Sequence, residues 1–292
     1  MLAWGGSFVA ARHLLNPASP GRTPLDPLIL AAARFAIASL IFAVPFVTAI
    51  VRRRIGARDL LRMAVLGQVA FSTYFWLQYI GVRNTNAGIA SILVVGLFPS
   101  ATTLLAPLGG EKRPPLPAWG ALLIGFLGVG VVVLGKPVEV STSSTFLVGA
   151  LCLVANAFAF AVYSLLSRRW MAGVPPLIMT AGTMTFGTAG LAVLGLIVSP
   201  RGWSALGRLD GSGWAALLYL ALICSAAAYF AWNFALSRVG APRASVWIYA
   251  EPVVAVSLGA AILGERPGWA AFAGSAAIAI SVLWATRARV PG

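Results

Sequence analysis

Charged residues are scarce in this chain. They make up 10% of its 292 residues, whereas 60% of the residues are hydrophobic. Soluble domains have about 25% charged and about 45–50% apolar residues, so the composition excludes an ordinary soluble protein. The net charge of +14 lies in short clusters between apolar runs. Nucleic-acid-binding domains instead gather basic residues on one folded face. The clusters therefore indicate loop charge that sets orientation in a membrane.

Residues that bind metals or perform catalysis are also rare. Cys152 and Cys224 lie inside apolar runs, where small buried thiols are expected. His13 is the only histidine, and one histidine without acidic or cysteine neighbours makes no metal site. The sequence lacks the G-x-x-x-x-G-K-[ST], H-E-x-x-H and G-x-S-x-G motifs. We therefore expect neither an enzyme nor an ATP-driven pump, and no cofactor.

Long apolar runs are abundant. A bilayer core about 30 Å thick needs roughly 20 apolar residues in a helix. By this measure the sequence predicts an all-α integral membrane protein with ten transmembrane helices, over residues 1–15, 27–51, 60–80, 86–108, 116–135, 145–167, 174–199, 213–236, 241–263 and 268–286. The first run gives only about 22 Å of helix, which leaves open a start further upstream.

The basic residues predict how these helices are oriented. With both termini in the cytoplasm, the cytoplasmic side receives the clusters at 52–62, 112–113, 168–169, 238–243 and 287–289. Fewer basic residues fall on the opposite side. Because cytoplasmic loops carry an excess of Lys and Arg, we expect a multi-pass protein of the cytoplasmic (inner) membrane with both termini inside.

Two stretches of the chain repeat each other about 154 residues apart. Matching residues occur in the same order in both copies: Tyr74, Arg83, Ala90, Ser91, Pro99, Gly110 and Glu111, then Tyr229, Arg238, Ala244, Ser245, Pro252, Gly264 and Glu265. We assign residues 1–135 to a first repeat, 136–144 to a linker, 145–286 to a second repeat and 287–292 to a cytoplasmic tail. Five helices per repeat is an odd number, so the second repeat is inverted in the membrane. Inverted repeats around a central site are typical of secondary transporters.

Short motifs in both repeats carry a family resemblance. They are Trp4-Gly5-Gly6-Ser7-Phe8, Arg34, Gln78-Tyr79-Ile80-Gly81, Asn233-Phe234-Ala235-Leu236, Ala244-Ser245, Glu251-Pro252 and Leu263-Gly264-Glu265. In their order and spacing the chain resembles the EamA branch of the drug/metabolite transporter superfamily. The resemblance covers essentially the whole chain. It implies a ten-helix carrier of two inverted five-helix halves, and it names no substrate.

Glu251 is the clearest candidate for the central site. It lies ten residues into the predicted helix 241–263, near the bilayer midplane, and Pro252 follows it. Ionisable groups at this depth are costly and need partners or a wet cavity. We expect Glu251 to bind a cationic substrate group or to carry a coupling proton. The alternative is a carboxyl retained for packing. In the first repeat the equivalent proline, Pro99, follows Phe98, so only the second repeat places a charge there.

Aromatic and amide side chains mark two further helices. Tyr74, Gln78 and Tyr79 share one side of the helix 60–80, and Tyr229, Trp232 and Asn233 repeat the arrangement in the helix 213–236. Rings and amides at matched positions suit a pocket for an amphipathic small molecule. Helix packing and interfacial aromatic belts are the alternatives. Weaker candidates of the same kind are Trp247, Asn156 and Tyr163.

Arg34 and the Gly-Glu pairs have simpler interpretations. Arg34 lies near the outer end of the helix 27–51, where its side chain can extend to the surface or contact an anion. Glu111 and Glu265 precede the helices 116–135 and 268–286, whose N-terminal amides favour a carboxylate.

Three classes of function follow. The leading class is a secondary carrier of small organic metabolites by alternating access, with export of amino acids or related compounds expected. The second class is a membrane protein that translocates lipids or amphipaths or acts as a non-transporting partner subunit, and the third is a membrane enzyme. A polar pocket around Glu251, Asn233 and Gln78 favours the carrier, whereas a groove open to lipid favours the translocase.

Overall fold

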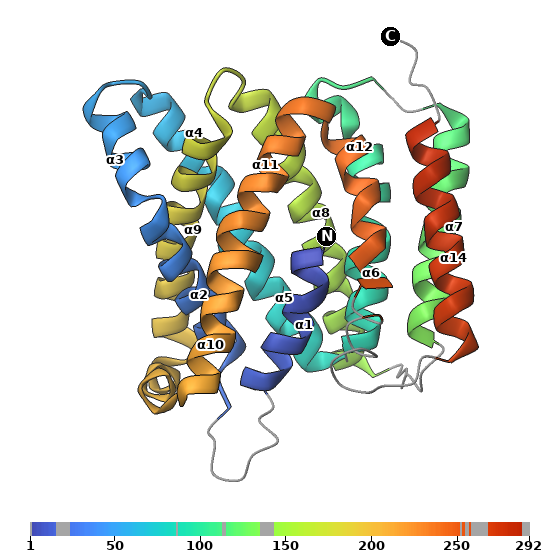
Figure 1. Ribbon diagram of the computed structural model, residues 1–292, viewed down its shortest axis with the longest axis horizontal. Helices are drawn as coiled ribbons and strands as arrows, with labels where there is room; N and C mark the ends of the chain where they lie inside the picture. The colour runs from blue at the N-terminus through green and yellow to red at the C-terminus, as the bar shows by residue number, and fades with distance from the viewer. Residues whose placement is uncertain are drawn as a thin grey trace.

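The computed structural model describes residues 2–15, 24–85, 87–112, 115–134, 143–251, 253–254, 257 and 268–287. Among these residues there is no β-strand, and long helices lie alongside one another in a bundle (Figure 1). Helices α7 and α14 form a closely packed pair at one edge of this bundle. The expectation of an all-helical protein is confirmed for the described part of the chain.

The helices of the first part of the chain are α1 (Leu2–Leu15), α2 (Pro27–Ile41), α3 (Ala43–Val51), α4 (Ala57–Gly67), η1 (Gln68–Thr73), α5 (Tyr74–Asn84), α6 (Ala87–Leu104), η2 (Ala106–Gly109) and α7 (Leu116–Leu134). Those of the second part are α8 (Ser144–Trp170), α9 (Pro176–Val198), η3 (Pro200–Arg208), α10 (Gly211–Tyr219), η4 (Leu220–Ala227), α11 (Ala228–Val239), α12 (Ala241–Val246), η5 (Trp247–Tyr249) and α14 (Trp269–Arg287).

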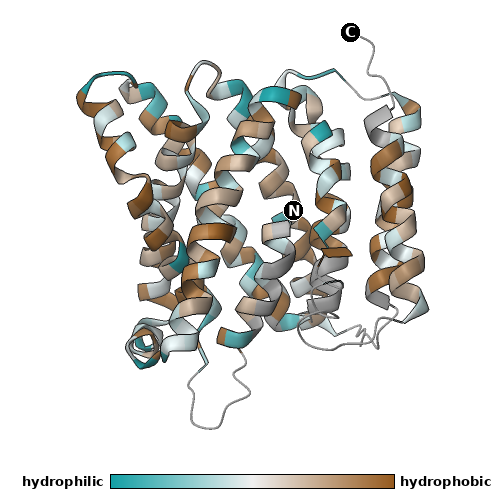
Figure 2. Ribbon diagram, in the orientation of Figure 1, coloured by the Kyte–Doolittle hydropathy of each residue, from teal (hydrophilic) through white to brown (hydrophobic). Residues whose placement is uncertain are grey.

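Several of these helices are long and apolar enough to cross a membrane. Within the described residues, four pass this test: Ala57–Val82, Ser144–Trp170, Pro176–Val198 and Gly211–Val239. The α2–α3 pair makes a fifth if it counts as one bent span. Figure 2 shows hydrophobic residues along the middle of the helices and hydrophilic residues at many of the turns. Leu40 and Val44 are more than 70% exposed, as expected of side chains that face lipid.

The predicted helix 27–51 is not straight. It breaks at Phe42, where α2 and α3 meet at 58°. Pro45 explains the break, because proline has no backbone N–H for the carbonyl of Ile41 and its ring clashes with that carbonyl. The sequence analysis missed this kink, although the proline that causes it is visible in the sequence.

Two π-helical turns interrupt otherwise continuous helices. The turn η1 lies between α4 and α5, and η4 lies between α10 and α11. Both turns contact other helices through polar groups. Gln68 of η1 donates from Nε2 to the carbonyl of Phe186 in α9 at 2.7 Å. Ser225 of η4 accepts a 2.8 Å hydrogen bond from Nε of Arg34 in α2. Each π turn is thus bonded to a helix from the other part of the chain.

Helices α2 and α9 begin alike and pack in opposite directions. Pro27-Leu28-Ile29 opens α2 and Pro176-Leu177-Ile178 opens α9. Ile29, near the start of α2, lies against Gly195 near the end of α9. Phe46 of α3 contacts Phe186 at a ring distance of 6.3 Å. Between these contacts the hydroxyls of Ser39 and Thr188 are 3.1 Å apart. The two helices are therefore antiparallel.

Glycine permits the closest approach between α4 and α9. A methyl group added at Gly67 would collide with the carbonyl oxygen of Thr183 and lie 2.9 Å from the backbone nitrogen of Gly187. Backbone atoms cannot move aside as a side chain can. Small residues at such crossings let membrane helices pack backbone to backbone.

We expect Gly67→Ala to destabilise the protein by about 1–3 kcal/mol, because overpacking a tight contact has this cost. The measurement is the thermal unfolding midpoint of the purified protein in detergent. Gly130→Ala is the matched control, since nothing lies within 4 Å of the added methyl group there. The control should unfold at the wild-type temperature or slightly above it. Equal midpoints for the two variants would contradict the packing described.

Candidate functional site

Ten aromatic rings meet where the helices of the two parts of the chain converge. We call this group the central aromatic cluster; neighbouring rings in it have centroids 4.8–6.4 Å apart, and its members are Trp4, Phe35, Phe71, Tyr74, Phe75, Phe98, Phe160, Tyr163, Tyr229 and Trp232. They come from α1, α2, η1, α5, α6, α8 and α11.

Phe160 of α8 lies at the centre of this cluster. Its ring contacts six of the others: Trp4, Tyr74, Phe98, Tyr163, Tyr229 and Trp232. The sequence analysis did not select Phe160. A signal was present, because Phe160 follows Asn156 by four residues and precedes Tyr163 by three, which places all three on one helix face.

The candidates from the sequence separate into two groups. Tyr74, Tyr163, Tyr229 and Trp232 belong to the central aromatic cluster. The other ring candidates do not: Tyr79 is partly buried and packs against the core, while Trp247 is 50% exposed. Gln78 is half-buried on α5. The structure therefore brings together four of the selected rings, from α5, α8 and α11, and leaves Trp247 at the surface.

Asn233 makes hydrogen bonds through both the oxygen and the nitrogen of its amide. Its Oδ1 accepts from the hydroxyl of Tyr163 at 2.8 Å, and its Nδ2 donates to Oγ1 of Thr180 at 2.9 Å. All three residues are buried. The network ties α11 to α8 and α9. In this conformation the Asn233 amide serves helix packing, so it can reach a ligand only if the network opens.

Asn156 is buried but only half satisfied. Its Nδ2 donates to the backbone carbonyl of Tyr74 at 2.6 Å, while its Oδ1 has no hydrogen-bond partner among the described residues. An unsatisfied buried acceptor costs about 1–3 kcal/mol. Beside the central aromatic cluster, this oxygen is available to a donor on a bound molecule.

Arg34 points into the protein. Its Nε donates to Ser225, and its guanidinium carbon lies 5.0 Å from the centre of the Phe35 ring. The half-buried side chain is therefore directed toward η4 in this conformation. The guanidinium also lies within electrostatic range of Tyr74 and Tyr229.

Glu251 is half-buried and lies within electrostatic range of the same two tyrosines, Tyr74 and Tyr229. Pro252, which the sequence analysis paired with it, lies outside the described residues. Among those residues, Arg34 and Glu251 do not form an ion pair, and no three His, Cys, Asp or Glu side chains gather as a metal site. Opposite charges thus flank the tyrosines without neutralising each other directly.

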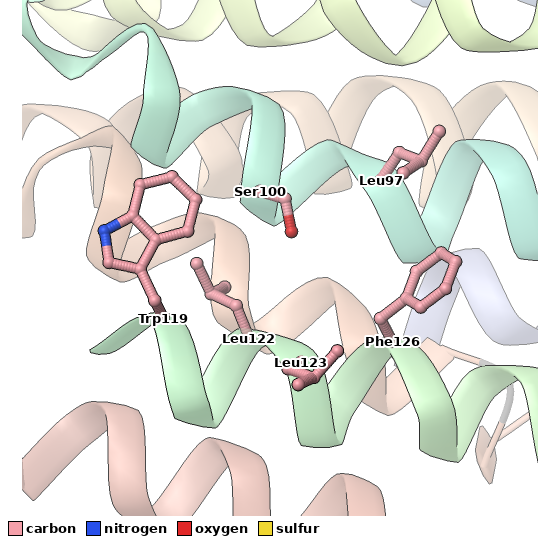
Figure 3. Close-up of a pocket in the computed structure, with 6 residues that line it drawn as sticks. All are labelled: Leu97, Ser100, Trp119, Leu122, Leu123 and Phe126. Carbon is pink, nitrogen blue, oxygen red and sulfur yellow. The ribbon is translucent and has the colours of Figure 1, made fainter. Parts of the chain in front are cut away.

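A shallow groove of about 240 Å³ lies between α6 and α7 (Figure 3). Its lining is apolar apart from the Ser100 hydroxyl and the Trp119 indole, with Leu97, Leu122, Leu123 and Phe126 forming the rest. Trp119 and Leu123 are partly exposed, so the groove is on the outer surface of the bundle. None of the residues selected from the sequence lines it.

Glu111 does not serve the helix predicted for it. Its Oε1 accepts a hydrogen bond from the backbone N–H of Ala241 at 3.0 Å, and lies 3.1 Å from Nη1 of Arg168. The carboxylate therefore sits at the start of α12, in the other part of the chain, rather than capping α7. Gly240 adopts a φ of +84°, and a side chain there would collide with Arg168. Glu265, its counterpart in the repeat, lies outside the described residues.

Tyr163→Phe should lower the free energy of unfolding by about 1–2 kcal/mol. The change removes the donor to Asn233 and leaves a buried acceptor unsatisfied. Thermal unfolding in detergent measures the effect. The control is Ser204→Ala on η3, because the hydroxyl of this exposed serine donates only within its own turn. Its unfolding midpoint should equal that of the wild type. An unchanged midpoint for Tyr163→Phe would show that the network contributes nothing.

Glu111→Ala should destabilise the protein by about 1–2 kcal/mol, whereas Glu111→Gln should cost less. Glutamine keeps an acceptor for the Ala241 N–H and loses only a partly exposed ion pair, which is worth little. Unfolding midpoints at low and high salt test this. If both variants lose the same stability at low salt and neither loses stability at high salt, the effect belongs to the ion pair instead.

Comparison with known proteins agrees with this architecture. The model of the EamA-like transporter family matches residues 1–134 and 147–287. An uncharacterized transporter of Archaeoglobus fulgidus is 27% identical over 286 residues, covering 98% of this chain and 95% of the relative. A probable terminal-alkyne amino-acid exporter of Streptantibioticus cattleyicolor is 26% identical over 276 residues, covering 94% and 87%.

A solved crystal structure shares the fold. It superimposes with a TM-score of 0.77 at 23% identity, covering 98% of this chain and 94% of the other. The family model spans both parts of the chain, and the described helices are those of a multi-pass membrane protein. The chain belongs to the EamA-like transporter family.

Proposed function

We propose that this protein is a secondary carrier of small amphipathic organic metabolites, with amino-acid-like compounds as the leading class. In this proposal ten spans form two inverted five-helix halves, and rocking of the halves exposes a central site to each side of the membrane in turn. The observation that carries the proposal is the antiparallel contact of α2 with α9.

That contact has the geometry of an inverted repeat. Pro27 and Pro176 open the two helices 149 residues apart (176 − 27), and the touching hydroxyls of Ser39 and Thr188 are also 149 residues apart (188 − 39). A residue that touches its own repeat equivalent lies on the axis relating the repeats. Because the helices are antiparallel, that axis is a two-fold between inverted halves. The π turns η1 and η4 fall in equivalent helices, which supports the same relation.

In this proposal the central aromatic cluster is the substrate site. Its rings come from both proposed halves, with Phe35 and Tyr74 from the first, and Phe160 and Tyr229 from the second. Gln78 and Tyr79 lie on α5 and Asn156 lies on α8, two helices that carry rings of the cluster, and Glu251 lies within electrostatic range of Tyr74 and Tyr229. Rings offer apolar contact and the charged and amide groups orient a ligand. We retain all of these, with Trp232 and Asn233, as proposed substrate-binding residues, and Tyr163 and Trp247 as weaker ones.

A relative's name favours the amino-acid class, because the Streptantibioticus protein is described as a probable amino-acid exporter. We also propose that both termini face the cytoplasm, since the basic clusters at 52–62 and 168–169 lie at cytoplasmic turns in that orientation.

Translocation of a lipid-like amphipath is the second candidate. The apolar groove between α6 and α7 favours it, because that groove lies on the surface of the bundle. The carrier ranks first because the charged residues and most of the selected rings lie inside the bundle and not at this groove.

Transport by the purified protein in liposomes tests the proposal. Radiolabelled amino acids and related metabolites are offered with and without an imposed proton gradient, and a fluorescent phospholipid is assayed in parallel. Saturable uptake or exchange of a soluble metabolite supports the carrier. Movement of the phospholipid alone supports the translocase, and movement of neither would contradict both.

Glu251→Gln separates the two roles proposed for this carboxyl. If Glu251 carries the coupling proton, the variant loses gradient-driven accumulation and keeps solute exchange. If it binds a substrate amine, affinity falls in both assays. Asp59→Asn, at the exposed start of α4, is the matched control and should transport normally. Normal accumulation and exchange by Glu251→Gln would remove this residue from the mechanism.

A further inference from the structure

We propose that Arg34 binds the carboxylate of a zwitterionic substrate whose amine faces Glu251. The proposal rests on the carrier function above and makes its substrate class specific: a small molecule with both an anionic and a cationic group and an apolar side chain. Each proposed half of the protein then supplies one charge to the site.

The guanidinium of Arg34 has donors to spare. Only Nε is engaged, by the neutral hydroxyl of Ser225. No carboxylate among the described residues lies within ion-pair distance of it. The two terminal nitrogens carry four N–H donors in a planar fork, which matches a carboxylate in a bidentate contact. A cation placed at membrane depth without an anionic partner is a functional site by default.

The surroundings of Arg34 fix its position. Ser225 holds one edge of the guanidinium and the Phe35 ring lies beneath it. Phe35 in turn packs against Phe71, Phe75 and Tyr229, at ring distances of 4.8, 5.1 and 5.6 Å. The charge therefore borders the central aromatic cluster, where an apolar substrate side chain would lie.

The equivalent position in the other repeat carries no charge. The equivalent of Arg34, by the 149-residue offset that relates α2 to α9, is Thr183 (183 − 34). Thr183 is buried and donates to the carbonyl of Met179 in its own helix at 2.8 Å. By the 153-residue offset that relates Pro99 to Pro252 (252 − 99), the counterpart of Glu251 is Phe98, which is 2% exposed within the cluster. Each charge thus replaces a neutral residue that the other half accommodates at the same place.

Tyr74 and Tyr229 lie within electrostatic range of both Arg34 and Glu251, while the two charged groups do not form an ion pair with each other. Tyr74 also lies beside Asn156, whose Oδ1 lacks a partner in the described structure. A zwitterion bound between the charges would pair its carboxylate with Arg34 and its ammonium with Glu251. The ammonium would also donate to Oδ1 of Asn156.

Three related probes test the proposal on the purified full-length protein: L-phenylalanine, L-phenylalaninamide, which lacks the carboxylate, and 3-phenylpropionate, which lacks the amine. Binding is measured by the shift in thermal unfolding and by competition in the liposome assay. The wild-type protein should bind L-phenylalanine best. Arg34→Gln should weaken L-phenylalanine about 10- to 100-fold, the range expected for a charge-assisted bidentate contact, and leave L-phenylalaninamide nearly unchanged.

Further variants separate binding from folding. Arg34→Lys keeps the charge without the fork and should lose part of the affinity. Ser225→Ala frees Nε and should weaken L-phenylalanine by a smaller factor. Arg201→Gln, at an exposed position of η3, is the matched control and should bind all probes normally. Arg34→Gln protein that elutes as wild type in size-exclusion chromatography has folded, so its binding can be interpreted.

Any one of four outcomes would overturn the inference. Arg34→Gln that still prefers L-phenylalanine to its amide shows that Arg34 does not recognise the carboxylate. Equal weakening of all probes assigns Arg34 a purely structural role. Binding of none of the probes by the wild type also contradicts it. Transport of metabolites that are not zwitterions would refute this inference and leave the carrier function standing, whereas absence of all transport would refute the carrier function itself.

Discussion

The antiparallel contact between α2 and α9 organises the rest of the structure. Ser39 and Thr188 meet within it, and the π turns η1 and η4 are each bonded to one of the two helices. Lipid gives membrane helices no hydrophobic reason to associate, so close packing and interhelical hydrogen bonds must hold them together. Gly67 and Gly187 permit the close packing. Gln68 and Ser225 make the interhelical hydrogen bonds. The central aromatic cluster then lies beside this seam, lined by helices from both sides of it.

The few polar groups inside the bundle divide into two kinds. Most are satisfied by the protein itself, as in the chain from Tyr163 through Asn233 to Thr180, and these stabilise helix packing. A smaller set is incompletely satisfied by the described residues: Oδ1 of Asn156, Oγ of Ser167 and Nε1 of Trp203 are buried without a hydrogen-bond partner, and Arg34 uses only its Nε. A buried donor or acceptor without a partner carries a free-energy cost that a packed scaffold has no reason to retain. A bound substrate supplies a reason, and this is the physical basis of the proposed site.

Much of the helical framework could be predicted from sequence, because a helix that crosses lipid needs a long apolar run. The kink at Phe42 was not predicted, although Pro45 in the sequence is a known cause of such kinks. The π turns correspond to no comparable residue pattern in the sequence. The site was harder to predict. Rings in equivalent helices pointed to Tyr74 and Tyr229, but Asn233 turned out to be engaged in packing, and the inward turn of Arg34 depends on Ser225, 191 residues away. Such partners across the bundle are set by tertiary packing and are not visible as a local pattern.

The central claim is that the two halves are inverted in the membrane, and side-specific cysteine labelling tests it most directly. The turn between α3 and α4 and the segment η3 follow the equivalent helices α2–α3 and α9, and lie at opposite ends of the bundle (Figure 1). In a protein lacking Cys152 and Cys224, Arg54→Cys and Gly207→Cys are labelled in intact cells with a membrane-impermeant maleimide. The account predicts labelling of Gly207→Cys from outside and of Arg54→Cys only after lysis. Labelling of both positions from the same side would contradict it.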